Sequence, residues 1–433
     1  MAIILYTPST SPRLAYITAY LFEQLLGDSL VVTTDASVYQ SFTGVRINYS
    51  EAPVARQEVH LRPHGLLAAT GKEAVPISTF LIGETPAFFA SGPGYALPFD
   101  PLATSFYLLS RYEEYLPFTP DEHGRYPARL SWAARSGCLQ HPVVMAWALL
   151  LATAIQGKFP AWVPVRPGYR LLPTLDIDLP WAFRHRGLRG LARAGLDVLQ
   201  GQWRRVRARL EVCWGGAPDP YFTFPQLQEL HEAAQIRPRI FWLLGDRSRH
   251  DVNPPYDNNA YQQLIRSTTT WSDSGIHPSY RSFGNLARLR TEQQRLATIL
   301  DQPVSHSRQH FLRLQLPQTY QQLLAAGIRH DYTMGYAEVP GYRAGTTEPF
   351  RWYDLNREQT TDLWVHPFVA MDVTLQNYQG LSASAAADYL QELQTYCRRE
   401  QLSFSILWHN SSFSAQHGWA GWWAVYAGLF AEA

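Results

Sequence analysis

The feature that most constrains the fold is a regular alternation of short apolar segments with amphipathic helical segments, from Leu171 to the end of this 433-residue chain. Such alternation predicts parallel strands joined by helical crossovers, and a run of this length favours an α/β domain built as a distorted (β/α) barrel. The predicted strands are Pro173–Ile177, Ile240–Leu244, Phe311–Leu314 and Phe404–Leu407, and the predicted helices cover residues 224–234, 258–268, 286–300, 319–326 and 383–400.

The part of the chain before this alternation has a pattern of its own. Predicted strands at 3–6 and 30–33 flank a predicted helix at 13–26, which gives a β-α-β start. A second helix is predicted from Asp100 to Leu116, because Asp can cap a helix and the following proline suits its first turn. A third covers residues 143–155, and the Pro-rich segment 159–168 is the predicted linker. We therefore predict a smaller α/β domain over residues 1–165 and the barrel domain over 170–433.

Composition narrows the classes of function. An apolar content of 46% with 17% charged residues is typical of a globular protein with a large core, and a net charge of +1 gives no field that favours nucleic acid. The three cysteines are widely spaced, which fits a reducing compartment. The first residues lack the basic start of a signal peptide, and no segment has the length of a membrane span. These observations predict a cytoplasmic protein that does not bind nucleic acid.

Two acidic residues one position apart, Asp176 and Asp178, stand at the end of the first predicted barrel strand. Two unpaired carboxylates at the end of a buried strand are costly unless a metal, an arginine or a proton compensates them. Strand ends are also where α/β folds collect their chemistry. The pair therefore predicts a metal-assisted hydrolytic site with one acid as ligand and the other as base. A surface turn, where Asp is common, is the alternative.

Three later segments add histidines and arginine in chain order. Together they supply divalent-metal ligands, an acid and a charge partner. They are His277 in Gly275–Ser282; His306, Arg308 and His310 in Ser305–Arg313; and His409 directly after the last predicted strand.

In this order, the Asp-x-Asp pair, the His motif, the Arg motif and the late Leu-x-His resemble the polysaccharide deacetylase family (NodB homology, carbohydrate esterase family 4). The resemblance covers the chain from Leu171 onward, apart from an insertion at about 184–210. Residues 97–101, 106–115 and 121–125 resemble an uncharacterised domain that precedes such deacetylases in Bacteroidetes-type proteins. The resemblance implies a hydrolase that removes N-acetyl groups from a sugar in a cell-envelope polysaccharide or its precursor.

The resemblance also implies a role for each motif residue. Asp176 would be the general base and Arg308 the charge partner that keeps it ionised. His409 would be the general acid that protonates the leaving amine. Asp178 and His277 would be the first two ligands of a divalent metal.

The third metal ligand departs from the family pattern. The family usually places a second histidine four residues after the first, but this chain has Arg281 there, and a cation cannot ligate a metal. His310 is the predicted replacement, with His306 as the second choice. Zinc is the usual expectation for an Asp-His-His site, although other first-row metals fit equally well.

Substrate contacts are predicted for Tyr280 and Trp408, which neighbour the motif histidines, and for Arg343 in a glycine-flanked loop. A surface arginine in an ordinary turn is the alternative for Arg343. The expected partner is an N-acetylated glycan or a lipid-linked sugar precursor.

The insertion is strongly basic, with eight arginines against one acid between Arg184 and Arg209. Its apolar residues recur mostly every three or four positions, so we predict an amphipathic helix with a basic face over 184–210. Such a helix could contact an anionic membrane surface or steer a phosphorylated or lipid-linked substrate. The alternative is a solvated helix that packs on its own protein.

Two other classes share some of these features. Nucleotide-sugar glycosyltransferases carry Asp-x-Asp at a strand end, but that class leaves the later histidines unexplained, and the chain has no glycine-rich phosphate loop. A catalytically inactive, sugar-binding relative of the deacetylases would be expected to have replaced Asp176 or His409, and both are present.

Overall fold

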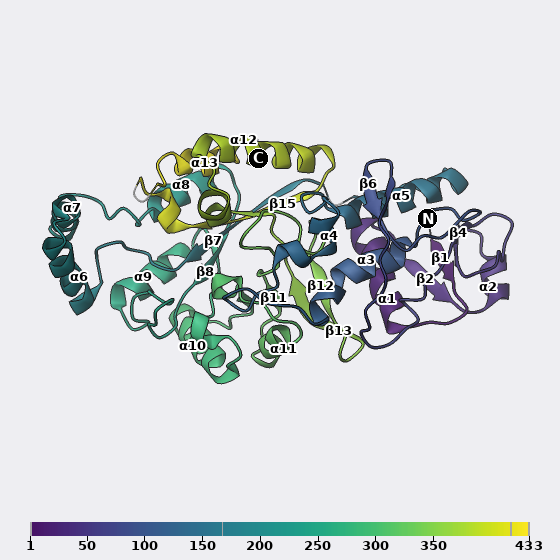
Figure 1. The fold of residues 1–433 in the computed structure, drawn as a ribbon, viewed down its shortest axis with the longest axis horizontal. Helices are drawn as coiled ribbons and strands as arrows, with labels where there is room; N and C mark the ends of the chain where they lie inside the picture. The colour runs from purple at the N-terminus through teal and green to yellow at the C-terminus, as the bar shows by residue number, and fades with distance from the viewer. Residues whose placement is uncertain (1, 167, 416–417, 432–433) are drawn as a thin grey trace.

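The computed structural model describes residues 2–166, 168–415 and 418–431. Its N-terminal part is built on a four-stranded parallel sheet with the order β2-β1-β3-β4, so the predicted β-α-β start is confirmed (Figure 1). An antiparallel hairpin and three more helices follow. The elements are β1 (Ile3–Tyr6), α1 (Pro12–Thr18) continued by the π-helix η1 (Ala19–Leu25), β2 (Leu30–Thr33), α2 (Ala36–Ser41), β3 (Val45–Tyr49), β4 (Val59–Leu61), β5 (Phe80–Ile82), β6 (Thr85–Ala87), α3 (Pro101–Leu109), α4 (Trp132–Arg135) and α5 (Val143–Lys158).

Helix α3 begins where the sequence predicts but ends earlier. The Asp100 carboxylate accepts hydrogen bonds from two backbone amides of the first turn, so the predicted cap is present. The predicted extension to Leu116 is wrong, because Arg111 adopts a left-handed conformation with φ 54° that turns the chain out of the helix. A short 3-10 turn, η2 (Tyr112–Tyr115), follows.

The C-terminal part is built on a nine-stranded sheet with the order β12-β13-β11-β10-β9-β8-β7-β15-β14. Neighbouring strands are parallel except for the β12–β13 pair at one edge. Chain order runs round this sheet as in a (β/α) barrel, and the ring is open between β12 and β14 in the described residues. The predicted fold class, a distorted barrel after a smaller α/β part, is confirmed.

Helices surround this sheet (Figure 1), and most lie within one or two residues of their predicted bounds. The strands are β7 (Arg170–Ile177), β8 (Arg239–Trp242), β9 (Asp273–Ile276), β10 (His306–Ser307), β11 (His330–Asp331), β12 (Phe350–Asp354), β13 (Gln359–Val365), β14 (Ala370–Met371) and β15 (Ser403–His409). The helices are α8 (Phe224–Ala233), α9 (Asn259–Thr268), α10 (Leu286–Leu300), α11 (Gln318–Ala325), α12 (Ala383–Arg399) and α13 (Trp422–Gly428).

The strand predicted at Phe311–Leu314 is wrong. The strand in this region is β10, and a 3-10 turn, η5 (His310–Leu312), follows it. Phe311 and Leu312 have φ angles of 61° and 53°, in the left-handed region that ordinary side chains rarely adopt. The apolar residues after His310 therefore form a turn rather than a strand.

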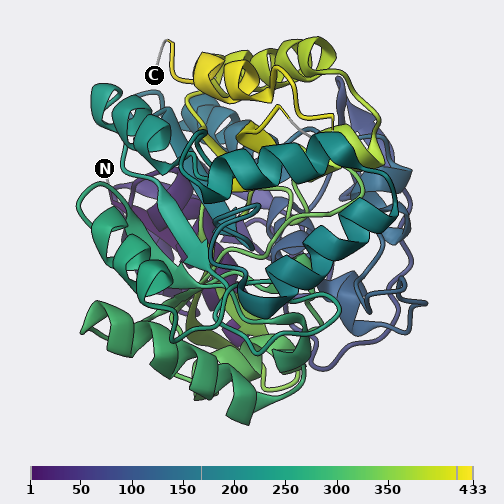
Figure 2. The same ribbon diagram turned by 90° about the vertical axis from the view of Figure 1, so that its left-hand side faces the viewer.

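The basic insertion is a helical hairpin rather than one helix. Helices α6 (Gly187–Leu199) and α7 (Trp203–Cys213) are joined by a turn in which Gly201 has φ 65°. Figure 1 shows the hairpin at one end of the molecule, and Figure 2 shows both helices on the face turned toward the viewer.

The N-terminal and C-terminal parts are joined by buried contacts. Arg13 of α1 is buried and donates hydrogen bonds to both carboxylate oxygens of Glu358, in the β12–β13 turn, at 2.9 and 2.5 Å. The predicted division into 1–165 and 170–433 stays a prediction, and residues 1, 416–417 and 432–433 of those ranges lie outside the described part of the chain. Among the described residues, no helix is both long enough and apolar enough to cross a membrane.

Candidate metal centre

Strand β7 delivers the acid pair into the interior of the C-terminal part. Asp176 is buried, and its Oδ1 lies 2.9 Å from Nη1 of Arg308, which is itself fully buried. The Arg308 guanidinium also donates to Oγ1 of Thr174 and to the backbone oxygen of Tyr332, which fixes its plane. The predicted ion pair is therefore present, and it compensates the first of the two buried carboxylates.

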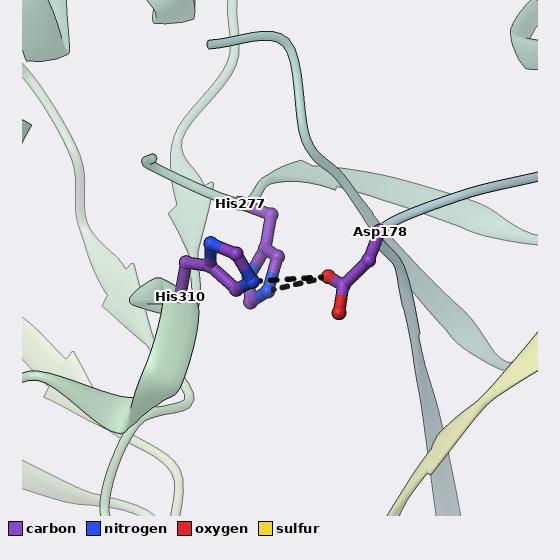
Figure 3. A group of neighbouring side chains, drawn as sticks. All are labelled: Asp178, His277 and His310. Carbon is purple, nitrogen blue, oxygen red and sulfur yellow. Dashed lines mark ion pairs between the residues drawn. The ribbon is translucent and has the colours of Figure 1, made fainter. Parts of the chain in front are cut away.

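The second carboxylate faces two imidazoles (Figure 3). Oδ1 of Asp178 lies 3.3 Å from Nε2 of His277 and 3.6 Å from Nε2 of His310. In the described residues, this is the one group of three or more His, Cys, Asp or Glu side chains whose ligand atoms gather within 4.8 Å. The structure thus brings together the three predicted ligands, while the second choice, His306, stacks on His330 with ring centroids 4.3 Å apart.

Hydrogen bonds orient both imidazoles toward Asp178. Nδ1 of His277 lies 2.6 Å from the backbone oxygen of Arg308, and Nδ1 of His310 lies 3.0 Å from Oδ1 of Asp251. Both partners only accept hydrogen bonds, so each Nδ1 carries the proton and each Nε2 is the atom turned toward the centre. Asp251 in turn accepts hydrogen bonds from the hydroxyl of Ser248 and a backbone amide.

The donor set fits a divalent metal. Oδ1 of Asp178 is buried, yet it accepts no hydrogen bond from any described residue. Burial alone would raise the pKa of Asp178, but His310 and His277 hold that pKa well below its usual range. Burial would likewise lower the pKa of His310, whereas Asp178 and Asp251 raise it to about 9, so a metal ion would displace a proton from this imidazole. One carboxylate and two imidazoles also leave a coordination position for a reacting molecule.

His409 stands at the end of β15, the strand that pairs with β7. Asp372 is fully buried; its Oδ1 lies 2.8 Å from Nδ1 of His409 and its Oδ2 accepts the backbone amide of the same residue. Burial would lower the pKa of His409, but Asp372, with smaller contributions from Asp178 and Asp176, raises it to about 10. The imidazole is therefore protonated at neutral pH and can donate a proton from Nε2.

These groups line one pocket of about 280 Å³. Strands far apart in sequence meet there, because the carboxyl ends of parallel barrel strands face the same side. The remaining wall includes Met371, Tyr378 and Trp419, together with Arg125 from the N-terminal part. Larger surface cavities, such as the one between Cys138 and Glu392, contain none of these groups.

The turn that carries His310 is held by the N-terminal part. Nη1 of Arg125 donates to the backbone oxygen of Phe311 at 3.0 Å, and Nε of Arg313 donates to the backbone oxygen of His123 at 2.8 Å. Consecutive left-handed residues persist only where their surroundings hold them. The segment around Arg125 thus positions the candidate third ligand.

Replacing Arg125 by alanine is expected to weaken metal affinity by about tenfold to a hundredfold, the usual effect of removing a support behind a ligand. The turn would lose the hydrogen bond at Phe311 while Asp178 and His277 stay in place. A competition titration with a chelating dye measures the affinity, and Arg129→Ala, an exposed arginine nearby, is the matched control. Equal affinity in the two variants would contradict the positioning role.

The three predicted substrate contacts do not line this pocket. Tyr280 lies beside the site, where the Arg313 guanidinium stacks 4.0 Å above its ring. Trp408 is fully buried and packs against Tyr426, and Arg343 is a buried partner of Glu114. In the structure, Trp408 therefore packs in the core and Arg343 forms an ion pair. Arg281, at the position where the family has a histidine, is exposed to solvent.

Glu114 joins two buried arginines. Its Oε1 accepts from Nε of Arg111 at 2.8 Å and from Nε of Arg343 at 2.9 Å, and its Oε2 accepts from Nη2 of Arg343 at 2.6 Å. Burial alone would raise the pKa of Glu114, but the two guanidinium groups lower it. The cluster of Arg111, Glu114 and Arg343 connects the turn after α3 to the loop before β12.

Glu114→Ala is expected to reduce the free energy of unfolding by about 3–5 kcal/mol, because it leaves buried positive charge uncompensated. Urea unfolding followed by circular dichroism measures the change. Glu122→Ala, at an exposed glutamate with a side chain 86% accessible, is the control and should cost less than about 1 kcal/mol. Similar losses in the two variants would contradict this account of the cluster.

Comparison with known proteins finds similarity of two kinds. Residues 3–160 match the model of a family described as a family of unknown function (DUF7033). No protein with a curated description matches the chain.

Several solved structures are similar to part of this chain. A Mycobacterium smegmatis protein assigned to the polysaccharide deacetylases is 14% identical, with a TM-score of 0.39 over 61% of this chain and 83% of its own. A polysaccharide deacetylase from Bacillus cereus is 12% identical, with a TM-score of 0.30 over 60% of this chain and 86% of its own. An allantoinase is 12% identical, with a TM-score of 0.36 over 72% of this chain and 90% of its own.

Proposed function

We propose that the protein is a metal-dependent hydrolase that removes acetyl groups from an N-acetylated sugar of a cell-envelope polysaccharide or its precursor. The observation that carries the proposal is the meeting, in one pocket, of an Asp-His-His ligand set, an arginine-paired carboxylate and a protonated histidine. These three elements meet the requirements of amide hydrolysis, because the carbonyl must be polarised, water must lose a proton and the amine must gain one.

A divalent metal held by Asp178, His277 and His310 would supply a Lewis acid and lower the pKa of water, and zinc is the first expectation for this donor set. Asp176 is positioned to take the proton of the attacking water through Oδ2, because Arg308 occupies its Oδ1. That Oδ2 atom lies 3.7 Å from Nε2 of His277, beside the candidate centre.

His409 is positioned to complete the reaction. Its Nδ1 is held by Asp372, so Nε2 faces the pocket and can protonate the amide nitrogen as the carbon–nitrogen bond breaks. Water adds across that bond, and the products are acetate and a free amine. The rings of Tyr378 and Trp419 in the pocket wall suit stacking on a sugar face.

The test combines metal content with acetate release. Protein purified without chelator is analysed for bound metal and then incubated with oligomers of N-acetylglucosamine, with Asp176→Asn as the inactive control. About one metal per chain and acetate release that Asp176→Asn abolishes would support the proposal. Protein that stays metal-free after addition of zinc would contradict it and favour a sugar-binding relative without catalysis.

A cytoplasmic location, which cell fractionation tests, would favour a precursor over a finished polymer as substrate.

A further inference from the structure

One face of helix α7 carries large apolar side chains that nothing in the described part of the chain covers. Trp203, Leu210 and Trp214 are 65%, 41% and 82% exposed. They are seven and four positions apart, and an α-helix turns about 100° per residue, so all three lie within about 40° of one another round the helix axis. They form an apolar stripe along the whole of α7.

Helix α6 also exposes apolar side chains near the tip of the hairpin. Leu199, the last residue of α6, is 84% exposed, and Leu196 and Val198 are also exposed. Single exposed apolar residues are common on proteins, but a cluster of Trp, Leu and Val at one projecting end marks an interaction surface.

Most of the charges beside the stripe are positive. Arg193, Arg204 and Arg207 are exposed, whereas the acidic residue of α6, Asp197, is buried and paired with Arg209 at 2.8 Å. Arg207 also reaches Glu211, at 2.7 Å. The solvent-facing side of the hairpin therefore combines an apolar stripe with an excess of guanidinium groups.

The base of the hairpin is held together by hydrogen bonds. Helix α6 begins at Gly187, nine positions after Asp178. Asp219 accepts backbone hydrogen bonds from residues 182–184, at 2.7 to 3.0 Å, and the Arg184 guanidinium donates to the backbone oxygen of Val212. These bonds tie both ends of the hairpin together.

We propose that the α6–α7 hairpin docks the protein on an anionic phospholipid surface. Trp and Leu side chains can enter the headgroup region while arginines bind lipid phosphates, and this combination is typical of helices that lie on membranes. Charge favours lipid over a second copy of the chain, because pairing two such faces would oppose like charges. Docking itself is independent of the proposed hydrolysis; only the further consequence, a lipid-linked sugar as substrate, rests on that function.

Sedimentation with vesicles tests the docking. The full-length protein is mixed with vesicles of phosphatidylcholine alone or with added phosphatidylglycerol, at low and high salt. We expect binding to the anionic vesicles only, and weaker binding at high salt because screening reduces the attraction. Trp203→Ser combined with Trp214→Ser should weaken binding by at least about tenfold, and Arg204→Gln by about fivefold. Leu81→Ser, which removes an exposed leucine of the β5–β6 hairpin, is the matched control.

Three outcomes would overturn the proposal. The first is unchanged vesicle binding in the double Trp variant, and the second is equal binding to neutral vesicles. The third is concentration-dependent self-association that the double variant abolishes, without vesicle binding, which would make the stripe an interface between copies. Acetate release from a soluble substrate, measured in the same variants, should be unchanged. A failure of the proposed hydrolysis would therefore be seen separately from a failure of docking.

Discussion

Asp178→Ala is expected to abolish stoichiometric metal binding. Asp178 is the one carboxylate among the three gathered ligands, and its Oδ1 is the atom toward which both imidazoles point. Its removal leaves two neutral nitrogens, and we expect the affinity for zinc to fall by far more than the roughly hundredfold caused by loss of a supporting residue. Elemental analysis of purified protein and a chelator competition titration measure the effect.

His310→Ala should lose metal in the same way, and Asp251→Asn should weaken affinity by about tenfold to a hundredfold because it replaces the charged acceptor at Nδ1 by a neutral amide. His306→Ala is the matched control, since this histidine lies in the same sequence motif but stacks on His330 away from the three ligands. Metal retained at full affinity in Asp178→Ala would refute the centre. Metal lost in His306→Ala but kept in His310→Ala would show that His306, and not His310, is the third ligand.

The second large effect concerns the proton donor. His409→Gln is expected to lower kcat for acetate release by about 10²- to 10⁴-fold, the usual contribution of a general acid, while metal content stays the same. The glutamine keeps a polar side chain in the pocket but cannot transfer the proton. A variant with near-normal kcat would show that His409 has no such role.

Asp372→Asn tests the same assignment through pH. The acid must be protonated, so activity should fall as pH rises through the pKa of His409, and Asp372 holds that pKa high. Replacing its charge by a neutral amide lowers the pKa, and the alkaline limb of the kcat/KM profile should therefore move to lower pH. An unmoved limb would mean that another group sets it.

Local pattern was sufficient to predict most of the helices. Helix α10 spans Leu286–Leu300 as predicted, because its apolar spacing and the cap at Asn285 agree with the tertiary fold. The residues after His310 are equally apolar, yet they form a left-handed turn that hydrogen bonds from distant segments support. Apolar content alone cannot distinguish these two outcomes.

The residues that support the site were harder to predict. The resemblance to the deacetylases implied the three gathered side chains, but nothing near Asp251 in sequence marks it as the partner of His310, 59 positions away. Arg343 is the opposite case. The sequence predicts that this loop arginine contacts substrate, but in the structure it is paired with Glu114, 229 positions earlier. Folding brings Glu114 and Arg343 together, so the ion pair cannot be predicted from the sequence near either residue.

The hydrogen bond from Arg125 to the backbone of Phe311 spans 186 positions and joins the segment that matches a family of unknown function to the barrel. A barrel expressed alone would have to shape its third-ligand turn without that support. Among related sequences, substitutions in the turn should therefore be accompanied by substitutions in the Arg125 segment. The first 160 residues would then be part of the catalytic unit itself, and grafting a barrel of this kind onto a foreign N-terminal domain should yield a protein that folds but binds metal poorly.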